Sequence, residues 1–188
     1  ENFMKGLYKA SARLLGYHAL YTVVALVFVL PFSRLIYYND GVVRPWGGII
    51  YTLVILLFYL PVLYSDLWHI GRSHTRKTSE IKPNFAYPFA ISVISEIPTY
   101  ILFALMVAVY VKDKNSFNIF YVIFKFWQSI YVGVLGISNV FYAVSLILPI
   151  VFAFLGYLAG TKNFEFAEKY FTTKTIAAMT AKIISMSI

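Results

Sequence analysis

Residues 112–162 read KDKNSFNIFYVIFKFWQSIYVGVLGISNVFYAVSLILPIVFAFLGYLAGTK, and the number of membrane crossings in this stretch decides the topology of the whole chain. Between Asn115 and Thr161, Lys125 is the only charged residue. A membrane-spanning helix needs about 20 largely apolar residues, so the stretch is long enough for two of them. Its two halves differ, however, because only the second half is uniformly apolar.

The second half predicts a span over about residues 140–160, since it carries no charge and ends at a lysine. The first half predicts a helix over residues 117–132 that does not span the membrane. Four polar residues at spacings of three, four and three mark one face of this helix: Asn118, Tyr121, Lys125 and Gln128. A thin polar stripe on an aromatic-rich helix is typical of the headgroup boundary or of a bundle interior.

The composition predicts an all-α, multi-pass membrane protein with a single integral membrane domain over residues 1–188. Hydrophobic residues make up 60% of the 188 residues and the mean hydropathy is +0.73, against about 45–50% apolar residues in ordinary soluble domains. Four spans are expected, at about residues 17–38, 48–70, 87–111 and 140–160. The absence of cysteine excludes disulfides and thiolate metal sites.

Basic residues gather near the ends of the apolar runs, which indicates membrane orientation and contact with lipid rather than nucleic acid binding. With four spans, 11 Lys and Arg lie on one side of the membrane and four on the other, whereas a fifth span through 117–132 gives seven and eight. The positive-inside rule therefore favours four spans with both termini cytoplasmic, as in a bacterial cytoplasmic membrane.

This orientation makes the basic loop 71–84 and the tail 161–188 cytoplasmic and puts the 117–132 helix on the outer side. Residues 1–16 and the first part of the tail show amphipathic spacing, so amphipathic terminal helices are expected at the membrane surface.

Glu96 is the sharpest candidate for a functional residue, because a carboxylate in the middle of an apolar span costs several kcal/mol unless it is neutralised or paired. Lys125 is one candidate partner, and such a pair would be either a structural lock or part of an ion or proton pathway. Alternatively, Glu96 is protonated and hydrogen-bonded to Ser92 or Tyr100 on its own helix. Pro98 frees a backbone carbonyl one turn earlier, which favours a polar pocket here.

Two further groups stand out. Asp66, His69 and His74 form an interfacial polar cluster that would need to converge to bind a metal, and with three histidines in the chain we expect no metal site. Gly156 and Gly160 form a small-xxx-small pair that allows close approach of helices, either within the fold or between copies.

The segment WHIGR at 68–72, followed by basic residues, and the segment LPIVFAFLGYLAGTK at 148–162 resemble small uncharacterised four-helix membrane proteins of Gram-positive bacteria. The resemblance implies a four-helix membrane fold and a bacterial origin, and it carries no activity to this chain.

No phosphate-binding glycine loop, nucleophile elbow or H-E-x-x-H pair is present. We therefore predict a non-enzymatic integral membrane protein without cofactors, acting as an accessory or scaffold subunit with a protein partner or as a homo-oligomer. The alternative is a small transporter or channel with its polar site at Glu96 and Lys125. A lipid-directed enzyme using Asp66, His69 and His74 is the third hypothesis.

Overall fold

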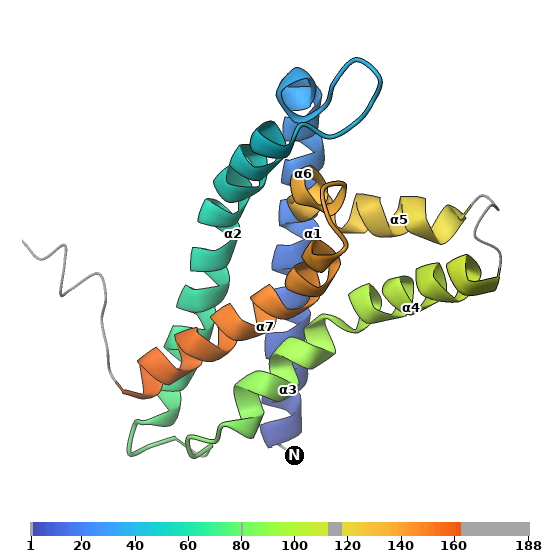
Figure 1. The fold of residues 1–188 in the computed structure, drawn as a ribbon. Coiled ribbons are helices and arrows are strands. Elements are labelled where there is room, and N and C mark those ends of the chain that lie inside the picture. The colour runs from blue at the N-terminus through green and yellow to red at the C-terminus, as the bar shows by residue number, and fades with distance from the viewer. Residues whose placement is uncertain (1, 80, 113–117, 163–188) are drawn as a thin grey trace, which may run out of the picture.

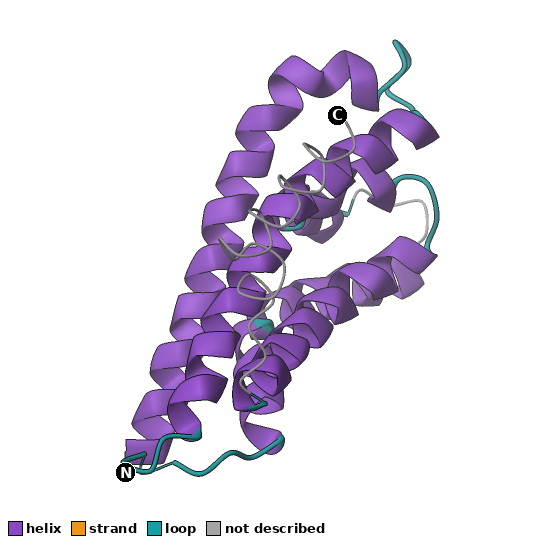
Figure 2. Ribbon diagram, turned by 90° about the vertical axis from the view of Figure 1, so that its left-hand side faces the viewer, coloured by secondary structure: helices purple, strands orange, loops and turns teal. Residues whose placement is uncertain are grey.

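The computed structural model describes residues 2–79, 81–112 and 118–162, and within these ranges the regular elements are all helical (Figures 1 and 2). The elements are α1 (Asn2–Ile36), α2 (Pro45–His74), α3 (Ala86–Ser95), α4 (Ile97–Lys112), α5 (Ile119–Trp127), the 3-10 turn η1 (Ser129–Tyr131), α6 (Val132–Leu135) and α7 (Val140–Thr161). The predicted all-helical fold is confirmed for the described residues.

Among the described residues, three helices are long and apolar enough to cross a membrane: α1, α2 and α7. The pair α3 and α4 passes the same test together but bends by 54° at the break between them, so it counts as a fourth span if it is one broken span. At 1.5 Å per residue, the 35-residue α1 is about 52 Å long and exceeds the roughly 30 Å hydrocarbon core of a bilayer. These lengths favour a multi-pass membrane protein.

Several boundaries differ from the sequence prediction. Residues 2–16 do not form a separate surface helix, because α1 runs through Gly16 without a break and buries Leu7, Ala10 and Leu14 against the bundle. Helix α2 extends to His74, which shortens the predicted 71–84 loop. The predicted 117–132 helix is divided into α5 and η1 because the chain turns at Gln128. The predicted amphipathic tail beyond residue 162 lies outside the described residues.

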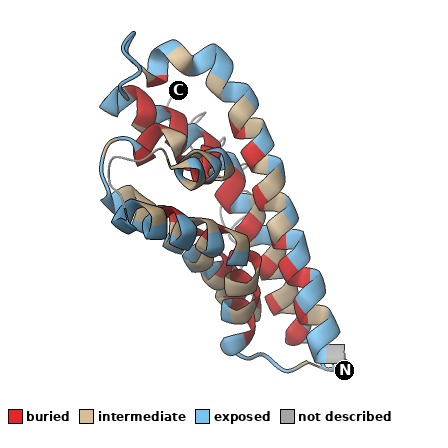
Figure 3. Ribbon diagram, turned by 90° about the vertical axis from the view of Figure 1, so that its right-hand side faces the viewer, coloured by how far each residue is buried: buried red, intermediate tan, exposed pale blue. Residues whose placement is uncertain are grey.

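The interior of the bundle contains polar as well as apolar side chains, and its outer surface is largely apolar. Figure 3 shows buried residues along the packed faces and exposed residues around the outside, with α4 mostly exposed. Buried polar side chains include His18, Ser92, Glu96, Thr99 and Gln128, whereas large apolar side chains such as Leu30, Leu57 and Val111 are exposed. This arrangement is expected where the surroundings are hydrocarbon rather than water.

Glycines bring three helices into backbone contact. A Cβ atom added at Gly156 would lie 2.3 Å from the carbonyl oxygen of Tyr64, and one added at Gly160 would lie 2.1 Å from that of Trp68. Gly48 of α2 faces Gly133 of α6 in the same way. The predicted glycine pair therefore serves helix packing within the fold.

Helices α4 and α5 form a hairpin that projects from the bundle (Figure 1). Of the 16 residues of α4, only Thr99 and Met106 are buried. Helix α5 returns toward the bundle, and its C-terminal end lies against α1. This return places Trp127 beside the break between α3 and α4.

Candidate functional site

The break between α3 and α4 places Glu96 inside the bundle. Pro98 has no backbone N–H, so the carbonyl of Ile94 loses its helical partner and the regular helix stops at Ser95. Glu96 itself has φ −93° and ψ 4°, outside the helical range. Its position after the ten residues of α3, at 1.5 Å per residue, lies about 15 Å along the span, and the residue is only 3% exposed.

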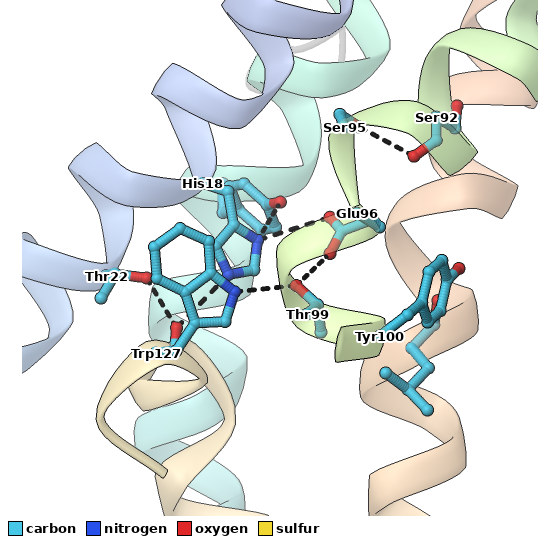
Figure 4. A network of polar contacts seen from close by, with 10 residues as sticks. His18, Thr22, Ser92, Ser95, Glu96, Thr99, Tyr100 and Trp127 are labelled. Atoms are coloured by element: carbon cyan, nitrogen blue, oxygen red, sulfur yellow. Dashed lines mark hydrogen bonds and ion pairs between the residues drawn. The ribbon is translucent and has the colours of Figure 1, made fainter. Parts of the chain in front are cut away.

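Glu96 has two side-chain partners (Figure 4). Its Oε1 lies 3.4 Å from Nδ1 of His18 on α1, and its Oε2 accepts a 2.7 Å hydrogen bond from the hydroxyl of Thr99 on α4. The side chains of His18 and Glu96 are 1% and 4% exposed. The carboxylate is thus enclosed and connects two helices that are distant in sequence.

Both nitrogens of His18 have partners, and these partners limit where its protons reside. Nε2 lies 3.3 Å from the backbone carbonyl of Trp127, which only accepts, so this nitrogen carries a proton. Nδ1 lies 3.2 Å from the hydroxyl of Tyr59 as well as 3.4 Å from Glu96. It accepts from the tyrosine when neutral and donates to the carboxylate when protonated. The site therefore accommodates two states that differ by one proton on Nδ1.

The end of α5 completes the network. The indole of Trp127 stacks on the His18 ring with centroids 4.9 Å apart, and its N–H donates to the Thr99 hydroxyl at 2.8 Å. The carbonyl of Trp127 also accepts from the Thr22 hydroxyl at 2.8 Å. The Trp127 carbonyl, at the C-terminal end of α5, thus contacts two side chains of α1.

Space beside Glu96 is narrow. The gap among α1, α2, α3 and α7, with Glu96, Ser92 and Ser95 in its wall, is too narrow to admit a water molecule. Gln128, next to Trp127 in the chain, is fully buried, and neither of its amide atoms has a hydrogen-bond partner in the described part of the chain. In this conformation the site is closed.

Lys125 does not pair with Glu96, so that prediction is corrected. Its ammonium lies 4.5 Å from the centre of the Tyr121 ring, and its side chain lines a groove between α5 and α1. The α5 end approaches Glu96 through Trp127, two residues further on. The predicted partners on the same helix are also replaced by Thr99: Ser92 donates to the carbonyl of Pro88, and Tyr100 to that of Leu146.

Asp66, His69 and His74 do not converge. Asp66 accepts from Arg13 at 2.9 Å, His69 packs edge-on to Trp68, and Nδ1 of His74 lies 3.0 Å from the hydroxyl of Tyr157. No group of three metal-ligating side chains occurs among the described residues. The three residues therefore serve three separate contacts.

His18 is a site residue that the sequence prediction missed, as it also missed Tyr59, Thr99 and Trp127. His18 shares a helix face with four residues that are also buried: Ser11, Leu14, Thr22 and Ala25. Helical spacing alone thus indicated a face with two hydroxyls and one histidine pointing inward, but it gave no sign that this face meets Glu96. No family model, curated protein or solved structure matches the chain, so the resemblance to small Gram-positive membrane proteins stays a prediction.

Proposed function

We propose that this chain is a non-enzymatic, multi-pass membrane protein in which the His18–Glu96 pair binds and releases a proton. Movement of protons across the membrane is the function that this arrangement supports best. The observation that carries the proposal is the position of His18 Nδ1, which faces a carboxylate and a phenol at once. Ionisable groups inside a membrane most often mark ion or proton pathways.

The cost of the carboxylate supports a role beyond packing. A glutamine at position 96 could accept the Thr99 hydrogen bond without placing a charge in hydrocarbon, where a charge costs several kcal/mol. A carboxylate adds the ability to exchange a proton with its neighbour. Discontinuous helices with polar groups at the break are also a recurring feature of transporter binding sites.

Coupling to movement follows from the position of α5. Protonation of His18 changes its hydrogen bonds to Glu96 and Tyr59, and the same ring stacks on Trp127 at the end of α5. Helix α4 meets the site at a break rather than within a regular helix. The α4–α5 hairpin is therefore the element whose position would respond to the proton.

The first experiment measures protonation through Trp127. In a background with Trp46→Phe and Trp68→Phe, Trp127 is the sole tryptophan, and a protonated imidazole stacked on an indole quenches its emission. We expect a pH-dependent change in emission that is absent in His18→Gln and altered in Glu96→Gln. Asp66→Asn is the matched control, since its carboxylate pairs with Arg13 instead. Emission that is independent of pH, or equal in all variants, contradicts the proposal.

The second experiment measures proton movement in liposomes that contain a pH indicator and carry an imposed membrane potential. We expect acidification with the parent protein and with Asp66→Asn, and its loss in Glu96→Gln and His18→Gln. Elution as a single folded species from size-exclusion chromatography controls for misfolding. Acidification that persists in both Glu96→Gln and His18→Gln contradicts a proton pathway through this pair.

A second candidate function is an accessory or scaffold subunit that contacts another protein or a second copy. The narrow gap beside Glu96 favours it, because a fully satisfied network with no room for water can act purely as a structural lock. In that case neither the parent protein nor Glu96→Gln moves protons in the liposome assay. Crosslinking in cells then recovers a protein partner from both. Recovery of the monomer alone contradicts the scaffold function.

A further inference from the structure

A groove between α1 and α5 has a mostly apolar lining and a lysine, Lys125, beside it. It encloses about 270 Å³, and its apolar wall consists of Leu26, Val29, Val122, Phe126 and Val132. Tyr37, Tyr121 and Lys125 line its polar part, where the lysine ammonium sits 4.5 Å from the Tyr121 ring centre. A slot of this kind matches a hydrocarbon chain that ends in an anionic group.

A second hollow adjoins the first through Tyr37, which lines both. It encloses about 410 Å³ around the end of α1 and the loop to α2, and it contains Arg34 and Arg44. The guanidinium of Arg44 lies 4.5 Å from the Tyr38 ring centre. Trp46, 79% exposed at the start of α2, marks this end of the bundle as the level of the headgroups.

The two hollows together carry a positive charge that the described residues do not neutralise. Arg34, Arg44 and Lys125 make no ion pair with a carboxylate in the described part of the chain. Asp40 is the acidic residue of the adjoining loop, and its carboxylate accepts from the backbone N–H of Val42 at 3.1 Å. A ligand with a net negative charge therefore fits better than a zwitterion.

We propose that this composite groove binds one anionic phospholipid. An acyl chain occupies the apolar slot between α1 and α5, and the phosphate and headgroup meet Lys125, Arg34 and Arg44. Arginines favour phosphate because their guanidinium can bind two oxygens at once. The site is distinct from the His18–Glu96 network and does not depend on the proposed transport function.

The test is native mass spectrometry of the full chain in detergent, titrated with phosphatidylglycerol, with phosphatidylcholine and with inorganic phosphate. We expect phosphatidylglycerol to bind more tightly than both other probes. A basic residue near the membrane surface contributes about 1 kcal/mol toward anionic lipid. Arg34→Gln combined with Arg44→Gln should therefore weaken phosphatidylglycerol binding about thirtyfold, and Lys125→Met should weaken it about fivefold.

The matched control is Lys5→Gln combined with Lys9→Gln, which removes the same charge from exposed positions near the opposite end of α1. It should leave phosphatidylglycerol binding unchanged. Val122→Trp, which fills the slot, should weaken binding without removing charge. Equal binding of the two lipids, equal losses in the control, or phosphate binding as tight as that of phosphatidylglycerol would overturn the proposal.

Discussion

Adding a methyl group at Gly156 or Gly160 tests whether backbone contact holds α7 to α2. The new Cβ atoms would lie 2.3 Å and 2.1 Å from carbonyl oxygens of α2, whereas ordinary contact begins at 3.4 Å. The two helices must therefore move apart by about 1 Å. Overpacking of this kind costs about 1–3 kcal/mol, and replacing a helical glycine by alanine returns about 0.5–1 kcal/mol. We expect each alanine variant to lose about 0.5–2 kcal/mol.

Thermal unfolding in detergent measures this loss. For a chain of this length, 1 kcal/mol corresponds to about 2–4 °C in Tm. The double variant should lose less than the sum of the single variants, because one separation of the helices relieves both clashes. Gly16→Ala is the matched control: a Cβ there meets no atom within 4 Å, so its Tm should stay level or rise. If Gly156→Ala and Gly160→Ala behave like Gly16→Ala, the close packing of α2 and α7 described above is wrong.

Three further predictions concern single contacts. Thr99→Val should cost about 1–3 kcal/mol in unfolding free energy, because it removes the partner of the partly buried Trp127 indole N–H and of the buried Glu96. Thr99→Ser should restore most of that loss in the same melting assay. Asp66→Asn should lower the unfolding free energy by less than about 1 kcal/mol, because its partner Arg13 is 41% exposed and exposed ion pairs contribute little. A larger loss in the melting assay would contradict this expectation. Gly41 has φ +80°, a conformation that asparagine adopts more easily than valine. Gly41→Val should therefore lower the unfolding free energy by about 1–2 kcal/mol, and Gly41→Asn by less. Equal melting temperatures for the two variants would contradict this backbone conformation.

The helices were largely predictable from the sequence because each one depends on the hydropathy and length of a single continuous stretch. The uncharged run at 140–160 matches α7 within one residue. Pro98 correctly indicated a disturbed backbone near Glu96. The direction of α4 was not predictable, because a proline marks a break without fixing how far the next helix bends.

The partners of Glu96 were not predictable because they depend on how separate helices align. His18 precedes it by 78 residues, and the contact requires a particular depth and rotation of α1 against α3. Lys125 was expected at the site because its charge complements that of Glu96. In the fold its side chain faces the groove against α1, while the backbone of Trp127 reaches the buried histidine.

The acceptor for His18 Nε2 is a main-chain oxygen, and this has a genetic consequence. Replacing the amino acid at position 127 deletes an indole but leaves that oxygen in place, so a screen of point substitutions cannot remove it. An insertion or deletion of one residue between Asn118 and Gln128 would instead move this backbone carbonyl by one residue along α5 relative to His18. Length changes in this short segment should therefore disturb the histidine more than any exchange of the tryptophan itself.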